Sequence, residues 1–332
     1  MTTISLPYDR QLVPGATIDD LDLDLVARTI VAAIDLSRDP GPRDPMVYLN
    51  RYGGMALDGD TRRPTVAGIL AYGREPDRWV PGSGIDIAAF ATDQVIPTRS
   101  RVRQIRGPIF QVIDDAVAQL RELCTISRIE GARLVNELDT PSIVLRELTT
   151  NAVVHRDLSE YGSQVRILVY PTVIEWSSPG GLSSTITIET LLTAQFSRNP
   201  TLAQFLFHAG YIERFGMGLD TVIDALRLVH LGDPEFYDDR HSFRVRVRRA
   251  VSFQPTAPDL RAPEGRAAVI LDLFTRRQVW RQHEILESIN IPRSTLQRDL
   301  ASLVAGGQLV VQGATKNRVY LLPPEKKRTP NP

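Results

Sequence analysis

Three polar residues at helical spacing carry the first chemical signal in this sequence. Glu147, Asn151 and His155 stand four positions apart in the stretch RELTTNAVVHRD at 146–157. Residues four apart share one face of a helix, so a helix over 142–155 would present a carboxylate, an amide and an imidazole together. The carboxylate could orient or deprotonate a water molecule, and the amide oxygen could bind Mg²⁺ beside nucleotide phosphates. The same pattern also describes a surface helix with a polar stripe, and we assign His155 and Arg156 to packing or capping at its end.

Two glycine-containing stretches follow this predicted helix. Ser178, Gly180 and Gly181 lie in a predicted loop over 177–184, directly after a predicted strand at 173–176. Gly216 and Gly218 stand at the start of a predicted helix over 218–229. Glycine allows positive φ and close approach of the backbone to a ligand. A Gly-x-Gly that opens a helix exposes N–H groups, which favour phosphates. The three features in this order predict a nucleotide site.

The order of these motifs resembles the Bergerat-fold (GHKL) ATP-binding domains, in which a helix with Glu and Asn precedes two glycine boxes. The sequence is more similar to the GHKL domain of Schlafen-like, RecG-C-terminal-like ATP-binding proteins. The matching runs are ELTTNAVVHRDLSEYGSQVRI, VIEWSSPGGL and SRNPTLAQFLFHAGYIERFGMGLDTV. Upstream, LPYDRQLVPGATIDDLD and TVAGILAYGREPDRWVPGSGIDIAAF resemble the segment that joins such domains to an AlbA-like N-terminal domain. We expect that AlbA-like domain itself to be missing.

The resemblance implies a role for each matching position, with ATP and Mg²⁺ as cofactors. Glu147 would be the catalytic base that activates water, and Asn151 would be the Mg²⁺ ligand. The positions implied to contact the nucleotide are Asn151, Ser178, Gly180, Gly181, Arg198, Arg214, Gly216, Met217 and Gly218. For Arg198 and Arg214 the residues alone favour a structural role on the surface.

One position departs from the family pattern. GHKL domains place an Asp, or in this subfamily often an Asn, before the first glycine loop to accept the adenine amino group, whereas this sequence has Ser177 and Ser178. A hydroxyl can accept the same hydrogen bond, but loss of a charged acceptor costs about 1–2 kcal/mol. ATP binding is therefore expected to be weak, altered or lost, and hydrolysis is less firmly predicted than binding.

The C-terminal segment has the pattern of a small DNA-binding module. Predicted helices cover 266–276, 282–288 and 293–305, and a predicted hairpin covers 308–312 and 318–322. The run IPRSTLQRDLASLVAGGQL resembles the recognition helix and wing entry of a winged helix-turn-helix. In such modules the start of the recognition helix enters the major groove. The candidate DNA contacts are Arg293, Ser294, Thr295, Gln297 and Arg298 in the helix and Lys316 and Arg318 in the wing. The alternative is a winged helix used for protein contact or dimerisation.

The amino-acid composition excludes several classes of protein. The chain has 332 residues, 39 Lys+Arg against 39 Asp+Glu, 42% hydrophobic residues and one cysteine, Cys124. A single thiol excludes a disulfide framework and a cysteine-rich zinc site. No apolar run reaches the ~18 residues that span a bilayer, so we expect a cytoplasmic protein without membrane contact. Positive charge is concentrated at 264–332, where eleven Lys/Arg face six Asp/Glu, and this favours a polyanionic partner there.

The expected fold class is α+β, namely a GHKL (Bergerat) α/β sandwich preceded by a small α/β segment and followed by a winged helix. The expected divisions are 1–130 for the N-terminal segment, with a candidate role in dimerisation, 131–251 for the ATP-binding domain, 252–263 for a linker, 264–322 for the winged helix and 323–332 for a disordered tail. In the N-terminal segment we expect helices at 20–34 and 109–126 and strands at 65–72 and 85–91.

Three functions remain open from the sequence. The first is an ATP-binding, DNA-binding transcriptional regulator, a homodimer in which nucleotide modulates the C-terminal winged helix on double-stranded DNA. The second is an ATPase that acts in a DNA-associated or defence process. The third is a degenerate scaffold that binds only protein. A sensor kinase is disfavoured, because the sequence shows neither a phosphoacceptor helix pair nor a membrane segment.

Overall fold

The computed structural model describes residues 6–39, 41–93, 100–130, 133–183, 185–193, 196–213, 218–250, 263–289, 291–313 and 318–323. The chain divides into two compact units, Met1–Phe253 and Gln254–Pro332. The expected boundary between 130 and 131 runs through the first unit, because one sheet takes strands from both sides of it. The expected linker at 252–263 lies almost wholly outside the described residues, as does the tail.

A six-stranded mixed sheet forms the centre of the first unit, in the order β4-β3-β7-β8-β10-β9. Its strands are β3 (Ile85–Phe90), β4 (Ser100–Ile105), β7 (Val165–Val169), β8 (Val173–Pro179), β9 (Glu235–Asp238) and β10 (Ser242–Arg248). The pair β3 and β7 is parallel, and the other neighbours are antiparallel. The expected mixed α+β fold is confirmed at this level.

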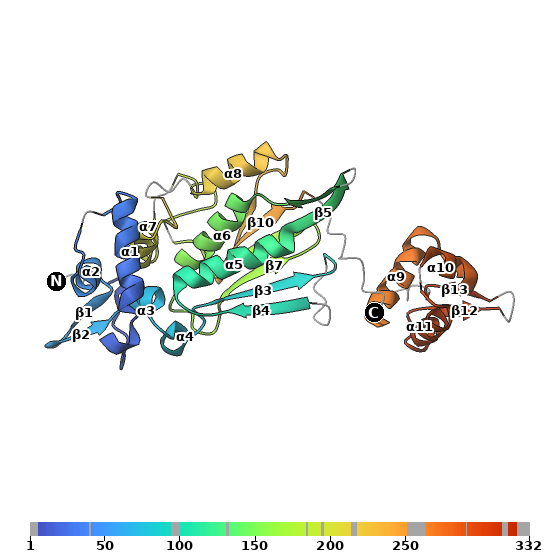
Figure 1. Ribbon diagram of the computed structural model, residues 1–332, viewed down its shortest axis with the longest axis horizontal. Helices are drawn as coiled ribbons and strands as arrows, with labels where there is room; N and C mark the ends of the chain where they lie inside the picture. Colours follow the sequence, from blue (N-terminus) through green and yellow to red (C-terminus); the bar gives the residue numbers. More distant parts are fainter. Residues whose placement is uncertain are drawn as a thin grey trace, which may run out of the picture. The chain divides into compact units, whose positions relative to one another are not determined.

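One layer of helices covers a single face of this sheet (Figure 1). It consists of α5 (Ile109–Cys124), α6 (Ser142–Val154) and α8 (Gly218–Leu228). Helix α6 begins after Pro141 and buries Val144, Leu145 and Leu148. Residues that repeat every three or four positions form one stripe of a helix, and this stripe packs into the core, while Glu147, Asn151 and His155 line the cavity described below.

A group of short elements forms the N-terminal side of the first unit. It contains two 3₁₀ turns, η1 (Tyr8–Arg10) and η2 (Ile18–Asp20), and the helices α1 (Leu23–Asp35), α2 (Pro45–Tyr52), α3 (Val66–Tyr72) and α4 (Pro76–Trp79). A hairpin of β1 (Met55–Asp58) and β2 (Thr61–Pro64) lies between α2 and α3. Helix α7 (Pro200–His208), far away in sequence, packs against α1, α2 and α3 (Figure 1).

Two expectations about local structure were wrong. The strand expected at 65–72 is helix α3, all seven residues of which are buried, and its first turn is capped by the Thr65 hydroxyl, which accepts from the Gly68 N–H at 3.1 Å. A short continuous apolar run does not distinguish a buried strand from a buried helix. The loop expected from 177 begins only at Gly180, because Ser177 and Ser178 pair with β10 and extend β8.

The structure also contains elements that the sequence did not indicate. A two-stranded sheet of β5 (Thr125–Glu130) and β6 (Arg133–Leu138) lies between α5 and α6. Strand β9 is the short edge strand next to β10. None of the helices in the described part of the chain is both long and apolar enough to cross a bilayer.

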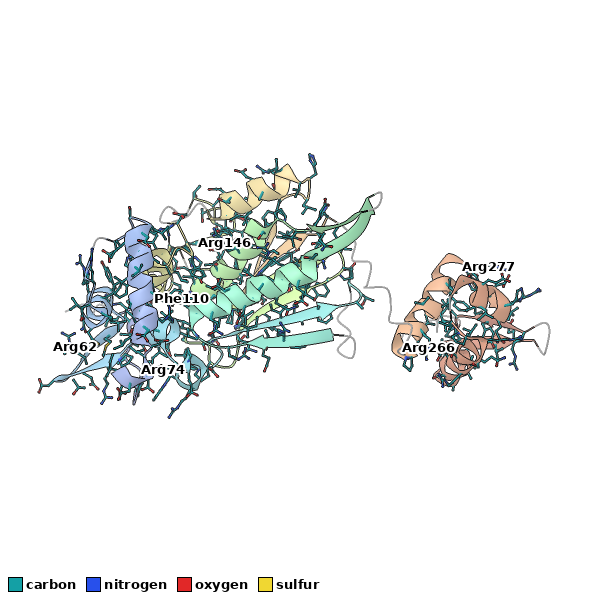
Figure 2. All side chains as sticks on the ribbon, viewed as in Figure 1. Arg62, Arg74, Phe110, Arg146, Arg266 and Arg277 are labelled. Atoms are coloured by element: carbon teal, nitrogen blue, oxygen red, sulfur yellow. The ribbon has the colours of Figure 1, made fainter. Side chains whose placement is uncertain are left out.

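The second unit has the element order α9 (Pro263–Arg276), β11 (Val279–Arg281), α10 (Gln282–Ser288), α11 (Arg293–Ala305), β12 (Val310–Gln312) and β13 (Val319–Leu321). Its strands form a sheet in the order β11-β13-β12. A separate core of this unit includes Ile285, Leu296 and Leu300. Arg266 of α9 forms a buried ion pair with Asp299 of α11 (Figure 2), which joins the first and third helices.

Candidate functional site

A cavity of about 420 Å³ opens between α6, α7, the end of β8 and the start of α8. Its volume lies in the range of small-molecule sites. The cavity is lined by all the described residues that were predicted for the nucleotide site, namely the catalytic candidate Glu147 and the nucleotide contacts Asn151, Ser178, Gly180, Gly181, Arg198 and Gly218. His155 also lines it. Arg214, Gly216 and Met217 lie outside the described residues.

Glu147 lies on α6 against the first residue of α8. The side chain is largely buried, and its Oε1 accepts a hydrogen bond from Arg146 Nη2 at 2.8 Å. Its Oε2 faces Gly218 so closely that a Cβ at Gly218 would lie 2.9 Å away. The same Cβ would lie 3.7 Å from Asn151 Nδ2. The carboxylate, the amide and the start of α8 are therefore brought together, as the sequence predicted.

The first glycine loop is shaped by contacts within the protein. Gly180 has a φ of +83°, and a Cβ there would lie 2.4 Å from the Asp157 Cβ. Its N–H donates to the His241 carbonyl at 2.8 Å, and the Gly181 N–H donates to the Arg240 carbonyl at 3.0 Å. Both amides are thus used inside the fold. These glycines are required by close packing of the chain on itself, a reason that the sequence analysis did not foresee.

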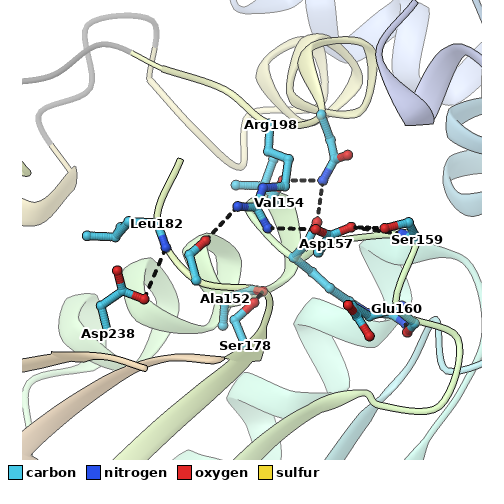
Figure 3. A network of polar contacts seen from close by, with 12 residues as sticks. Ala152, Val154, Asp157, Ser159, Glu160, Ser178, Leu182, Arg198 and Asp238 are labelled. Atoms are coloured by element: carbon cyan, nitrogen blue, oxygen red, sulfur yellow. Dashed lines mark hydrogen bonds and ion pairs between the residues drawn. The ribbon is translucent and has the colours of Figure 1, made fainter. Parts of the chain in front are cut away.

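Arg198 fastens this loop to the end of α6 (Figure 3). Its Nη2 donates to the Gly181 carbonyl at 2.5 Å, and its Nη1 pairs with Asp157 Oδ2 at 3.3 Å. The guanidinium therefore holds two segments of the cavity wall together. This geometry agrees with the structural role that the residue alone suggested.

Of Ser177 and Ser178, only Ser178 lines the cavity. The Ser178 hydroxyl donates to the Ala152 carbonyl of α6 at 2.7 Å (Figure 3). A hydroxyl has one proton and two lone pairs, so this hydroxyl has only acceptor capacity left. An incoming amino group could use that capacity.

His155 stands at the C-terminal end of α6. Burial and the nearby Arg198 charge lower its pKa to about 4, even though the residue keeps exposed surface. His155 lines the cavity, where solvent screens part of this lowering of the pKa. The imidazole is therefore neutral at pH 7. Arg156 is buried and donates to the Glu160 and Ser163 carbonyls at 3.1 and 2.9 Å, a structural role as expected.

The opposite wall of the cavity is apolar. It is formed by Ile186, Leu191 and Phe196 after the glycine loop and by Ala203 and Phe207 of α7. No pattern in the sequence indicated this wall, nor Gln204 and Glu213, which also line the cavity. A single sequence carries no signal for which distant segments meet in a cavity.

The site has few groups that could hold a metal ion by themselves. Among the described residues, no cluster of three or more His, Cys, Asp or Glu side chains could hold one. Mg²⁺ is usually bound by one or two protein oxygens together with phosphates and waters. The Asn151 amide oxygen and the Glu147 carboxylate fit that limited requirement, since both line the cavity.

Comparisons with known proteins agree with this geometry. Residues 162–247 match the family described as putative ATP-dependent DNA helicase recG C-terminal. The match supports a RecG- or Schlafen-like ATPase domain. Such a domain suggests ATP binding, usually with Mg²⁺. Helix α6 lies before the matched stretch, so Glu147 and Asn151 are placed at the site by the structure and not by this match.

The crystal structure of the DIP2311 protein from Corynebacterium diphtheriae has a similar fold, with a TM-score of 0.56 and 18% sequence identity. The likeness covers 96% of this chain and 64% of that protein, so this chain spans less than two thirds of its length. At this identity the likeness concerns the fold alone. No curated protein is significantly similar in sequence to this chain.

The predicted DNA contacts lie in the second unit. On α11, Arg293, Ser294, Gln297 and Arg298 are exposed and Thr295 is half-buried, while Arg318 is exposed just before β13. Lys316 lies outside the described residues. Leu296, Leu300 and Leu303 are buried, as predicted. The polar face of α11 is thus open to solvent.

Proposed function

We propose that this chain is an ATP-binding, DNA-binding transcriptional regulator, in which nucleotide at a GHKL-type site modulates a C-terminal winged helix. The observation that carries the proposal is the contact of Gly218 at the start of α8 with Glu147 and Asn151 inside one cavity. A helix start attracts phosphates. The family match suggests ATP binding independently of these residues.

At the nucleotide site each residue has a chemical task. Asn151 would hold the Mg²⁺ that accompanies the phosphates, and Glu147 would orient or deprotonate a water. The start of α8, with Gly218, would bind the phosphates. Ser178 would accept the adenine amino group with its free lone pairs, because its proton is already donated to the Ala152 carbonyl.

Features of the second unit support DNA binding. Its element order and its sheet order β11-β13-β12 support a winged helix-turn-helix, in which α11 would be the recognition helix. The exposed Arg293 and Arg298 suit contacts to phosphates or bases. The name of the matching family, a DNA helicase, points to the same class of partner. A homodimer would place two such helices on adjacent half-sites.

Fluorescence anisotropy of the full chain on promoter DNA, with and without ATP·Mg²⁺, tests this proposal. We expect binding that changes with nucleotide and weakens with salt. Arg298→Ala should weaken binding, whereas Arg227→Ala should not. Arg227 is an exposed arginine in the first unit, paired with Asp233, and it matches the change in charge. Absence of DNA binding with and without nucleotide would contradict the proposal.

An ATPase acting in a DNA-associated or defence process is the second candidate. It is favoured by Glu147, whose Oε1 is bound by Arg146 while its Oε2 faces the start of α8. Phosphate release from ATP that is abolished in Glu147→Gln, with ATP binding retained, would support this function. No phosphate release by the wild-type protein would exclude it. Absence of nucleotide binding altogether would leave the protein-binding scaffold.

A further inference from the structure

The start of helix α7 forms part of the cavity wall but lacks a cap of the usual kind. The first N–H groups of a helix have no partners within it, and an Asn directly before the helix normally supplies one. Asn199 occupies that position, but its side chain makes no cap hydrogen bond. Instead its Nδ2 donates to the Val154 and Arg156 carbonyls at 2.9 and 2.8 Å. Asn199 therefore holds the end of α6.

Asp9, from the other end of the first unit, supplies the missing cap. Its Oδ2 accepts hydrogen bonds from the N–H groups of Thr201 at 2.7 Å and Leu202 at 3.0 Å. Thr201 and Leu202 follow Asp9 in the sequence by 192 and 193 residues. Asp9 is fully buried. The carboxylate thus fills the place of an N-cap side chain for a helix to which it does not belong.

The far end of α7 is also held by the N-terminal segment. Arg38, which follows α1, donates from Nη1 to the Phe207 carbonyl at 2.8 Å and to the Ile212 carbonyl at 2.6 Å. Its Nη2 pairs with Glu213 at 2.6 Å. Phe207, Ile212 and Glu213 all line the cavity. Both ends of the helix that walls the cavity are therefore fixed by residues that precede the matched stretch 162–247.

We infer that Asp9 is a positioning residue of the nucleotide cavity, which acts by capping α7 from outside that helix. The inference rests on the proposed nucleotide binding. Pro200, Ala203 and Gln204 lie in the first turns of α7 and line the cavity. Loss of the cap frees the Thr201 and Leu202 amides and loosens these turns. The N-terminal segment is consequently part of the nucleotide site, although Asp9 itself does not line the cavity.

The surroundings of the Asp9 carboxyl suggest Asp9→Asn as a conservative variant. Burial raises the pKa of Asp9, against the lowering effect of the two amides, so the environment does not favour its charge. Asn is as good a helix cap as Asp and keeps the acceptor oxygen without the charge. We therefore expect Asp9→Asn to retain the capping role and Asp9→Ala to lose it.

Asp22 provides a matched control. It is also an Asp in the N-terminal segment, and its Oδ1 accepts from the N–H groups of Asp24 and Leu25 at 3.0 and 3.1 Å as the cap of α1. Asp22→Ala removes a cap of the same kind from α1, a helix that packs against α7 but contributes no residue to the cavity wall. Asp22→Ala and Asp9→Ala each lose two hydrogen bonds to backbone N–H groups. Asp22→Ala therefore shows how much a less stable fold alone changes the affinity for nucleotide.

The experiment compares wild type, Asp9→Ala, Asp9→Asn and Asp22→Ala in the full chain. Calorimetry measures the affinity for a non-hydrolysable ATP analogue with Mg²⁺, and amide hydrogen exchange without nucleotide measures protection of α7. We expect Asp9→Ala to lower the affinity about fivefold, the factor that corresponds to one lost cap, and to speed exchange at Thr201 and Leu202. Asp9→Asn and Asp22→Ala should match wild type in both measurements.

Equal affinity and equal α7 exchange in Asp9→Ala and Asp22→Ala would overturn the inference. If Asp9→Ala does not fold, Asp9→Asn decides, because loss of affinity or of α7 protection in that variant would contradict a capping role. If wild type binds no nucleotide, the proposed function fails. The exchange comparison then decides separately whether Asp9 holds α7.

Discussion

At the residue scale, the cavity depends on two positions that have no side chain. Gly180 needs its positive φ and the space beside Asp157, whereas Gly218 leaves room for the Glu147 carboxylate. The sequence indicated both glycines, but for contact with a ligand. In the structure, close contacts with other residues of the chain already favour a glycine at each position. A single sequence shows a small residue without showing which atoms approach it.

Gly218→Ala tests the contact with Glu147. The new Cβ would lie 2.9 Å from Glu147 Oε2, so the flexible carboxylate must move away while the fold is kept. We expect ATP·Mg²⁺ affinity to fall roughly tenfold with a change in unfolding free energy below about 1 kcal/mol. Gly162→Ala is the control, since a Cβ there meets nothing within 4 Å. Unchanged affinity in Gly218→Ala would contradict the site geometry.

His155 gives a pH-dependent prediction. Burial and Arg198 lower its pKa to about 4 in the folded protein, against about 6.5 in an unfolded chain. Between these values the unfolded chain binds a proton that the folded chain does not, so His155 makes stability fall as pH drops through this window. NMR titration of the imidazole should give a pKa below 6. A value near 6.5 or higher would show that the cavity does not exclude its charge.

At the scale of elements, one short stretch links the parts of the site. In the run Ser-Arg-Asn-Pro at 197–200, Arg198 holds the glycine loop, Asn199 holds the end of α6, and Pro200 begins α7. The bounds of α10 and α11 agreed with the sequence patterns, because each helix has a regular period and clear end signals. The Asp9 cap was not predictable, since its partners lie 192 residues away and no local pattern records them.

Asn199→Ala measures the connection between α6 and α7. The side chain is fully buried, and its removal leaves two carbonyls without their donor, so the unfolding free energy should fall by about 1–3 kcal/mol. Asn50→Ala is the control. Asn50 Nδ2 also donates to a carbonyl, that of Met46 at 2.7 Å, but the residue is only half-buried. Chemical denaturation should show the smaller loss for Asn50→Ala, and equal losses would count against this connection.

At the scale of the whole molecule, the chain consists of two units. The first is an α+β unit with a central six-stranded sheet and the cavity, and the second is small and has its own core. The sequence predicted the mixed α+β class of the first unit. It placed a division at 130, whereas β3 and β7 pair across that position, because strand pairing is a long-range property. The proposed regulation requires that nucleotide in the first unit change DNA binding by the second.

The measurement that tests the central claim most directly is a calorimetric titration of the full chain with a non-hydrolysable ATP analogue in the presence of Mg²⁺. We predict saturable binding of one nucleotide per chain, weakened by chelation of Mg²⁺ and by Asn151→Ala. Ligand at about one hundred times its Kd should also stabilise the folded state by about 2.7 kcal/mol. No binding heat and no stabilisation at millimolar nucleotide would contradict the account.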